Sequence, residues 1–302
     1  MPVTLAPATS RRRFLAQSAA AVCFGWSSRF LGAQSTAGAG DVWALFSDTH
    51  IDADPLAVSR GVTMTANLRS CVAEVLSRTE RPSGLILSGD CAHLKGMKAD
   101  YQTLKPLLQP LVEAKLPVHL LMGNHDDRVA VTEVLDRPTS PAVPSRFVSV
   151  QETPHANWFL LDSLDKVNAT PGVLGAEQLA WLGKELDARP DKPAVIVVHH
   201  NILLQEVKTD ALMDSAALLE VLRPRKQVKA CIYGHTHRWS ITQDETGLHF
   251  INLPPVAYVF KQEFPNGWVL ATLRPDAIQL ELRALDANHP QHGEIKTLKW
   301  RV

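Results

Sequence analysis

Short apolar runs recur between residues 42 and 233, and each one ends in polar side chains. The runs cover residues 42–46, 85–87, 116–122, 195–198 and 230–233. Because each run is only a few residues long and stops at glycine or polar residues, the pattern predicts buried strands. Helical patterns lie between several of the runs, which favours parallel strands joined by helical crossovers. An α/β fold is therefore expected.

Apolar residues at helical spacing predict the elements between these strands. The predicted helices cover residues 63–78, 101–114, 175–186 and 215–222, and a further strand is predicted at 158–161. Proline lacks the backbone N–H of a helix and its ring clashes with the preceding turn. Pro106 and Pro110 are therefore expected to break the second helix.

Two later stretches show different patterns. Residues 127–157 are rich in proline and lack a regular period, so we expect an irregular loop that caps the mouth of the site, where specificity tends to be set. From 248 to 302, apolar segments alternate with turn residues. Residues 249–253, 268–273 and 278–285 are expected to form antiparallel strands.

Residues 1–39 resemble a twin-arginine export signal. Arg11 and Arg12 precede an apolar stretch at 14–26 that is too short to span a membrane. Small residues at 37–39 provide a plausible cleavage site. We therefore expect an exported, periplasmic protein whose mature part, residues 40–302, forms a single domain without a membrane span.

Composition excludes several kinds of partner. The 302 residues carry 31 Lys and Arg against 31 Asp and Glu, so the formal charge is zero. No basic surplus indicates a nucleic-acid groove, and no polybasic run indicates a lipid surface. The four cysteines form no C-x-x-C pair, which argues against a structural zinc site.

The polar side chains that end the apolar runs are metal-ligand types. They comprise carboxylates, an amide and imidazoles, and such mixed nitrogen and oxygen donors suit Fe, Mn, Zn or Co better than Mg or Ca. The candidate ligands, in chain order, are Asp48, His50, Asp90, Asn124, His199, His235 and His237. This number is sufficient for two transition metal ions, and a carboxylate is the group that can bridge them.

The order of these motifs carries a resemblance. Asp-x-His, Gly-Asp, Gly-Asn-His-Asp, His and Gly-His-x-His follow one another as in the calcineurin-like metallophosphoesterase superfamily. The string from Gly123 to Arg128 resembles the bacterial branch that contains cyclic-nucleotide and glycerophosphodiester phosphodiesterases. The resemblance implies a four-layer α/β/β/α sandwich, in which two mixed sheets are flanked by helices.

The resemblance also implies roles for the ligands. Asp90 would bridge two ions. Asp48, His50 and His237 would complete the first position. Asn124, His199 and His235 would complete the second. Asn201 stands where the family often has proline, so His200 remains an alternative to His199 as the ligand, and otherwise a substrate contact.

The catalytic roles follow from the same resemblance. His125 would stabilise the transition state and protonate the leaving oxygen, with Asp126 holding its imidazole. A hydroxide between the two metals would attack phosphorus. Arg128 would bind the substrate phosphate, or else form a salt bridge with a neighbouring aspartate. Tyr258 and Phe260 are candidates for the mouth of the site.

The expected activity is hydrolysis of a small-molecule phosphodiester. A phosphomonoesterase or nucleotide pyrophosphatase is the alternative among enzymes. A metal-free binding module on the same fold is the alternative from another class, but every ligand position is filled and His125 is present, which favours an enzyme. The sequence does not indicate an oligomeric state.

Overall fold

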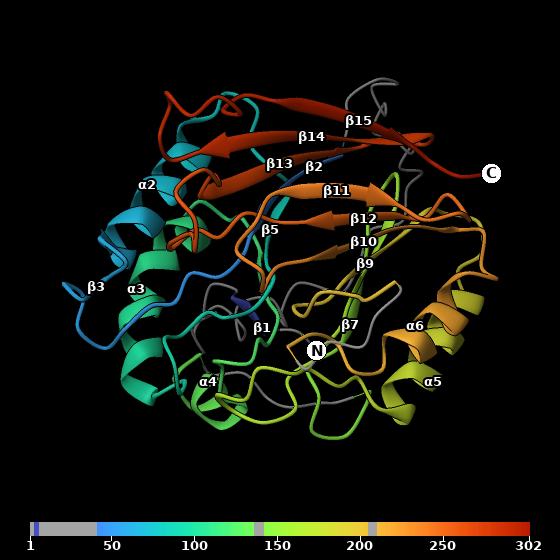
Figure 1. Ribbon diagram of the computed structural model, residues 1–302, viewed down its shortest axis with the longest axis horizontal. Coiled ribbons are helices and arrows are strands. Elements are labelled where there is room, and N and C mark those ends of the chain that lie inside the picture. The colour runs from blue at the N-terminus through green and yellow to red at the C-terminus, as the bar shows by residue number, and fades with distance from the viewer. Residues whose placement is uncertain (1–2, 6–40, 136–141, 205–209) are drawn as a thin grey trace, which may run out of the picture.

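The computed structural model describes residues 3–5, 41–135, 142–204 and 210–302. Within these residues, two large mixed sheets pack face to face and helices cover their outer faces (Figure 1). The predicted four-layer α/β/β/α sandwich is confirmed. None of the helices in the described part of the chain is both long and apolar enough to cross a bilayer.

The first sheet places the parallel strands β2, β5 and β6 side by side. Its order is β1 (Val3–Leu5), β6 (Val118–Leu120), β5 (Gly84–Leu87), β2 (Asp41–Phe46), β13 (Gly267–Leu273), β14 (Ala277–Ala284) and β15 (Ile295–Lys299). β1, which falls in the predicted signal segment, pairs antiparallel with β6. Residues 6–40, which hold the arginine pair, lie outside the described residues.

The second sheet contains the other strands that lead to the site. Its order is β11 (Ser240–Gln243), β12 (His249–Asn252), β10 (Val228–Tyr233), β9 (Ala194–Val197), β8 (Asn157–Leu160) and β7 (Ser149–Glu152). β12, which was expected to be antiparallel, pairs antiparallel with β11 but parallel with β10. β13 and β14 are antiparallel as predicted, and β15 adds a further antiparallel strand at this edge. A small ribbon of β3 (Val58–Ser59) and β4 (Val62–Thr63) lies apart from both sheets.

Three apolar cores hold the layers together. The helices α2 (Met64–Ser77), α3 (Lys98–Glu113) and α4 (Arg128–Leu135) pack on the first sheet. The helices α5 (Ala176–Asp187) and α6 (Ser215–Leu222) pack on the second. Between the sheets, the indole rings of Trp43 and Trp158 lie 5.6 Å apart in a core of aliphatic side chains. Burying these faces removes apolar surface from water, which is the main favourable term in folding.

The expected break in the second predicted helix does not occur. α3 runs without interruption through Pro106 and Pro110. The two prolines are four residues apart and both are exposed, while Leu104, Leu108 and Leu111 face the core. The carbonyl groups that lose a helical partner therefore lie on the solvent side, where water can satisfy them.

Residues 127–157 are less irregular than predicted. They contain α4 and β7. None of the described residues in this range lines the cavity of about 540 Å³ that His50 and Asp90 border. Val131, Val134 and Leu135 are buried at helical spacing, a short period that the prolines further along the segment obscure. The prediction of an irregular cap is therefore wrong for the described part of this segment.

Candidate metal centre

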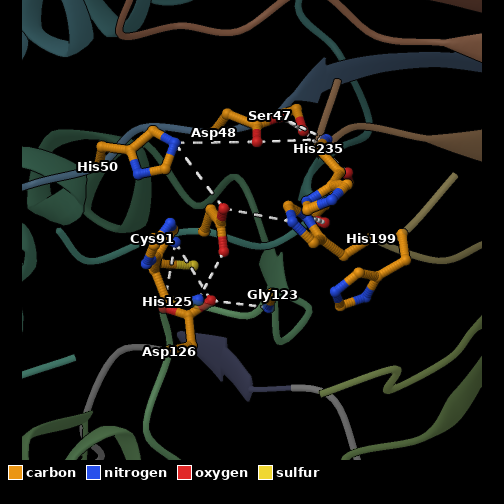
Figure 2. Close-up of polar contacts among 12 residues, drawn as sticks. Ser47, Asp48, His50, Cys91, Gly123, His125, Asp126, His199 and His235 are labelled. Atoms are coloured by element: carbon orange, nitrogen blue, oxygen red, sulfur yellow. Dashed lines mark hydrogen bonds and ion pairs between the residues drawn. The ribbon is translucent and has the colours of Figure 1, made fainter. Parts of the chain in front are cut away.

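The carboxyl ends of β2, β5, β6, β9 and β10 meet, and the predicted ligands lie in the loops that leave them. Asp48, Asp90 and His199 offer ligand atoms within 4.8 Å of one another, as do Asp48, His50 and His237. All of these side chains are buried. Figure 2 shows His50 and His199 on opposite sides of the cluster. Segments about 190 residues apart in sequence thus converge on one point, at the strand ends where α/β sheets bind ligands.

Asp90 lies between the two halves of this cluster. Its Oδ2 is 3.3 Å from Nε2 of His199 and 3.8 Å from Nε2 of His50. On one side, Oδ1 of Asp48 is 3.5 Å from Nε2 of His237. On the other, the rings of His199 and His235 lie 5.2 Å apart. Asp90 therefore pairs with an imidazole from each half, whereas the ion pairs of Asp48 are with His50 and His237 of one half.

The backbone at the ligands is strained. Asp48, His50, Asp90, His235 and His237 all have positive φ, between 45° and 67°. Left-handed backbone at residues other than glycine costs of order 1–3 kcal/mol each and persists only where surrounding contacts enforce it. Five such residues in one cluster indicate that the loops are built to aim side chains at a common point.

Glycines make room for the two carboxylates. A Cβ at Gly123 would overlap the carboxylate of Asp90, and a Cβ at Gly234 would overlap that of Asp48 and the hydroxyl of Ser47. These glycines precede the ligands Asn124 and His235 in sequence. The backbone of the Gly-Asn-His and Gly-His-x-His motifs therefore approaches the two carboxylates more closely than any residue with a side chain would allow.

The electrostatics of the cluster favour a bound cation. Burial by itself lowers the pKa of His199, but the facing Asp90 carboxylate outweighs it and raises that pKa to about 9. Burial lowers the pKa of His50 to about 3, despite the nearby Asp90. Burial raises the pKa of Asp90, yet His199 reverses this and holds it well below its usual range. Without a metal, a proton on His199 is the positive charge that balances Asp90.

The donor atoms fit a transition metal. Oδ1 of Asn124 is buried and has no hydrogen-bond partner among the described residues. An unpaired buried acceptor is costly, so its presence beside two carboxylates requires an explanation. A metal ion bound by imidazole, amide and carboxylate groups would satisfy it.

Carbonyl groups behind the imidazoles fix their tautomers. Nδ1–H of His237 donates to the carbonyl of Tyr258 at 2.5 Å, and Nε2–H of His235 donates to that of Asp210 at 2.7 Å. Nδ1–H of His199 donates to Ser88 at 3.0 Å. Each contact leaves the other ring nitrogen with a lone pair, as metal-binding histidines require.

His125 is oriented by a backbone contact. Its Nδ1–H donates to the carbonyl of Leu94 at 2.6 Å, and the residue helps to line the central cavity. Its ring lies 5.3 Å from that of His50 in an edge-to-face arrangement. Nε2 of His125 therefore remains available to a group bound beside the ligands.

Asp126 does not hold the His125 imidazole as expected. Its buried carboxylate instead accepts hydrogen bonds from the backbone N–H groups of Cys91, Ala92 and Gly123 and from the hydroxyl of Tyr101. Burial and the nearby Asp90 raise the pKa of Asp126 to about 6. Asp126 thus ties the loop of Asp90 to the loop of Asn124, as Figure 2 shows for its contacts with Cys91 and Gly123.

Replacing Asp126 with alanine is expected to destabilise the fold. The change leaves several buried donors unpaired, and each costs about 1–3 kcal/mol. We expect the free energy of unfolding to fall by about 3 kcal/mol or more in urea titrations. The exposed Glu133→Ala serves as a control and should change it by less than ~0.5 kcal/mol. An Asp126→Ala variant as stable as the control would contradict this role.

Arg128 does not point into the cavity either. Its guanidinium binds the buried carboxylate of Asp162 in a bidentate arrangement, with both contacts at 2.7 Å, and also reaches the carbonyl of Leu164. Arg128 is not among the residues that line the cavity, and its partner is Asp162 rather than Asp126 or Asp127. Asp162 lies 34 residues further along the chain, so local sequence gave no sign of it.

Replacing Arg128 with alanine is expected to cost stability and to leave substrate affinity unchanged. The change leaves the Asp162 charge buried, and breaking one side of such a pair costs roughly 3–5 kcal/mol. Thermal melting should detect this loss, while KM should stay within about twofold of the wild-type value. A large rise in KM without loss of stability would restore the predicted substrate role.

His200 is buried behind the cluster. Its Nδ1 lies 2.7 Å from Oγ of Ser163, and a Cβ at Gly172 would overlap its ring. His200 has no exposed surface and is absent from the cavity wall, so direct contact with substrate is not supported. One of its ring nitrogens lies within 4.8 Å of ligand atoms of His199 and His235. Of His199 and His200, His199 is the one that faces Asp90.

A cavity of about 540 Å³ opens over the cluster. Tyr258 and Phe260 line it, as the sequence suggested. Sequence reasoning did not assign a role in the wall to its other residues, which are polar and come from loops and strand ends: Asn168, Thr170, Asn201, Asp210, Tyr233, Thr236, Arg238, Ser240 and Asn252. The amide N–H of Asn168 donates to the carbonyl of Asn124 at 2.6 Å. This tertiary contact ties Asn168 to the site.

The fold and the ligand types at the strand ends define a metallophosphoesterase. A crystal structure of a dimetal phosphatase from Danio rerio shares the fold, with a TM-score of 0.66 and 17% identity over 86% of this chain and 98% of the other. The profile of the calcineurin-like phosphoesterase family matches residues 44–239. The chain belongs to this family, and it is a metal-dependent phosphoric ester hydrolase.

Two relatives carry more specific names. A probable cyclic nucleotide phosphodiesterase of Synechococcus is 31% identical over 79% of this chain and 91% of its own length. The glycerophosphodiester phosphodiesterase GpdQ of Enterobacter lignolyticus is 27% identical over 66% of this chain and 72% of its own length. Both names describe hydrolases of phosphodiesters.

Proposed function

We propose that this protein hydrolyses small-molecule phosphodiesters at a pair of transition metal ions. The observation that carries the proposal is that Asp90 faces an imidazole from each half of the cluster: its Oδ2 is 3.8 Å from Nε2 of His50 and 3.3 Å from Nε2 of His199. Asp48, His50 and His237 would complete one position, and Asn124, His199 and His235 the other. Fe, Mn, Zn and Co all suit these donors.

The residues of the site suit attack on phosphorus. Bound metal ions neutralise phosphate oxygens and lower the pKa of a water nucleophile towards neutrality. His125, held by Leu94, presents Nε2 to the cavity. A proton on that nitrogen can pass to the leaving oxygen as the ester bond breaks. The hydrogen-bonded loops keep the ligands in place, so little reorganisation accompanies the reaction.

The relatives and the cavity support a diester as the substrate. Both named relatives are phosphodiesterases. A diester carries a group on each side of phosphorus, and the cavity of about 540 Å³ extends over both halves of the cluster, from His50 and Tyr258 to Asn201 and His235. A monoester would fill only part of this space.

The purified chain, loaded with Mn²⁺, tests the proposal. Turnover of bis-p-nitrophenyl phosphate at a higher kcat/KM than p-nitrophenyl phosphate is expected, together with two metal ions per chain by elemental analysis. Loss of activity on chelation and recovery with Mn²⁺ should follow. Preference for the monoester would favour a phosphomonoesterase, and turnover of neither would remove the proposal.

Export through the twin-arginine route is part of the proposal. It is based on the arginines at 11–13 and the apolar stretch at 14–26. Cell fractionation of the full chain should find it in the periplasm, and a variant with Arg11 and Arg12 both changed to lysine should remain in the cytoplasm. Equal distribution of the two proteins would contradict export by this route.

A further inference from the structure

Three side chains pack against the outer side of two candidate ligands. Tyr258 and Phe260 follow β12 in sequence, and Arg60 lies in the turn between β3 and β4. We call these three residues the aromatic clamp. None of them is among the candidate ligands, so their contacts with the imidazoles need another explanation.

His237 is held on two sides by the clamp. The ring of Phe260 stacks on its imidazole with centroids 4.3 Å apart and an angle of 20° between the planes. The carbonyl of Tyr258 accepts its Nδ1–H at 2.5 Å. The hydrogen bond fixes the tautomer, and the stacked ring opposes rotation that would turn Nε2 away from Asp48.

His50 depends on the clamp in a different way. Its Nδ1 is buried and has no hydrogen-bond partner among the described residues. The ring of Tyr258 stacks on the imidazole at 5.2 Å, with 21° between the planes. Nε2 of His50 lies 3.0 Å from Nε2 of His237, its neighbour in the same candidate metal position. Among the described residues no backbone carbonyl accepts from His50, so the Tyr258 ring is the outer contact that orients this imidazole.

Arg60 covers the outer face of the aromatic pair. Its guanidinium carbon lies 4.8 Å from the ring centroid of Phe260 and 5.7 Å from that of Tyr258. Arg60 has a φ of 49° and Gly61 has a φ of 83°, so the chain turns tightly between β3 and β4. A guanidinium over two aromatic faces is attracted by both rings, which helps to hold the pair in place.

The other half of the cluster has no equivalent contact. His199 and His235 are restrained by carbonyl groups, and their ring contacts within the described chain are with each other and with His200. Neither stacks on a phenylalanine, tyrosine or tryptophan there. The two candidate metal positions therefore differ in how their histidines are held.

The clamp is fastened to the site by backbone contacts. The amide N–H of Val256 donates to the carbonyl of Ser47 at 2.8 Å, and that of Ala257 donates to Asp48 at 3.0 Å. Asn67 on α2 donates to the carbonyl of Ala257 at 2.7 Å. The segment 256–260 also lies beyond residues 44–239, which the family profile matches.

We propose that Arg60, Tyr258 and Phe260 are positioning residues that selectively strengthen one metal position, the one formed by Asp48, His50 and His237. The inference rests on the proposed two-metal centre. Outer contacts that orient metal-binding histidines typically change metal affinity by ~10–100-fold. The clamp should supply an effect of this size at one position and leave the other unchanged.

Phe260→Ala in the full chain tests the proposal, because Phe260 is 52% exposed and its loss should not prevent folding. Metal-stripped protein is titrated with Mn²⁺ by calorimetry. For wild type we expect two binding steps. For Phe260→Ala we expect one step weakened by ~10–100-fold and the other within about twofold. Phe260→Tyr should restore the affinity, and Phe264→Ala, which removes a nearby ring that contacts Arg238, should bind as wild type does.

Double variants identify the affected position. Combined with Asn124→Ala, Phe260→Ala should still weaken the remaining step, whereas combined with His237→Asn it should have no further effect. Wild type that binds fewer than two ions would overturn the two-metal centre itself. Wild type that binds two, with Phe260→Ala indistinguishable from it, would overturn the clamp alone. A raised KM at saturating Mn²⁺ with unchanged affinity would make Phe260 a substrate contact instead, which also overturns the clamp.

Discussion

Asp90→Asn is expected to abolish most of the activity and to release metal. The substitution keeps the size of the side chain and removes the charge that both halves of the cluster share. Asp90 faces Nε2 of His199 at 3.3 Å and of His50 at 3.8 Å, so both positions should weaken. Losing a metal contribution of several kcal/mol in the transition state corresponds to a fall of ~10³-fold or more in kcat.

Elemental analysis and steady-state kinetics measure the two effects together. We expect fewer than two Mn²⁺ per chain in Asp90→Asn under conditions where wild type holds two. Asp165→Asn, an exposed carboxylate, should match wild type in both measurements. An Asp90→Asn protein with full metal content and a rate within threefold of wild type would rule out the shared carboxylate.

His125→Ala is expected to lower kcat by ~10²–10⁴-fold, the usual contribution of a general acid or base. The imidazole contributes no ligand in the proposed centre, so metal content should stay at the wild-type value. The loss should be larger for a diester with an alkoxide leaving group than for bis-p-nitrophenyl phosphate. A poor leaving group needs the proton more than p-nitrophenolate does.

His93→Ala is the matched control for this prediction. Its imidazole lies 6.5 Å from that of His50 but pairs with Asp52 at 2.8 Å and is absent from the cavity wall. We expect a rate within about twofold of wild type. A rate for His125→Ala within about threefold of wild type, or an equal loss with both kinds of leaving group, would remove the general-acid role.

The sequence was sufficient to predict the strands that lead to the site. Apolar runs that stop at glycine or polar residues marked β2, β5, β6, β9 and β10, and the predicted helix at 215–222 matches α6. These features are local, because burial of a strand or of a helix face is written in the spacing of apolar residues. The order of polar residues at the strand ends then indicated the family.

Local reasoning failed where a side chain finds its partner far along the chain. Asp126 follows His125 in sequence, but its carboxylate accepts from Cys91, Ala92 and Tyr101. Arg128 binds Asp162. After a sharp turn, the side chains of adjacent residues point in different directions. The spacing of residues along the chain does not reveal which distant donor lies beside each of them.

The sequence by itself determined which residue types stand at the strand ends, and in what order. Only the tertiary structure decided how these side chains are held: which ring nitrogen of His235 or His237 remains free, and which aromatic rings press on His50. The reason is physical. Strand formation follows from apolar residues that are neighbours in the chain, whereas a hydrogen bond or a stacked ring requires two atoms from separate segments to come within a few ångströms, which the packing of the two sheets and their loops fixes.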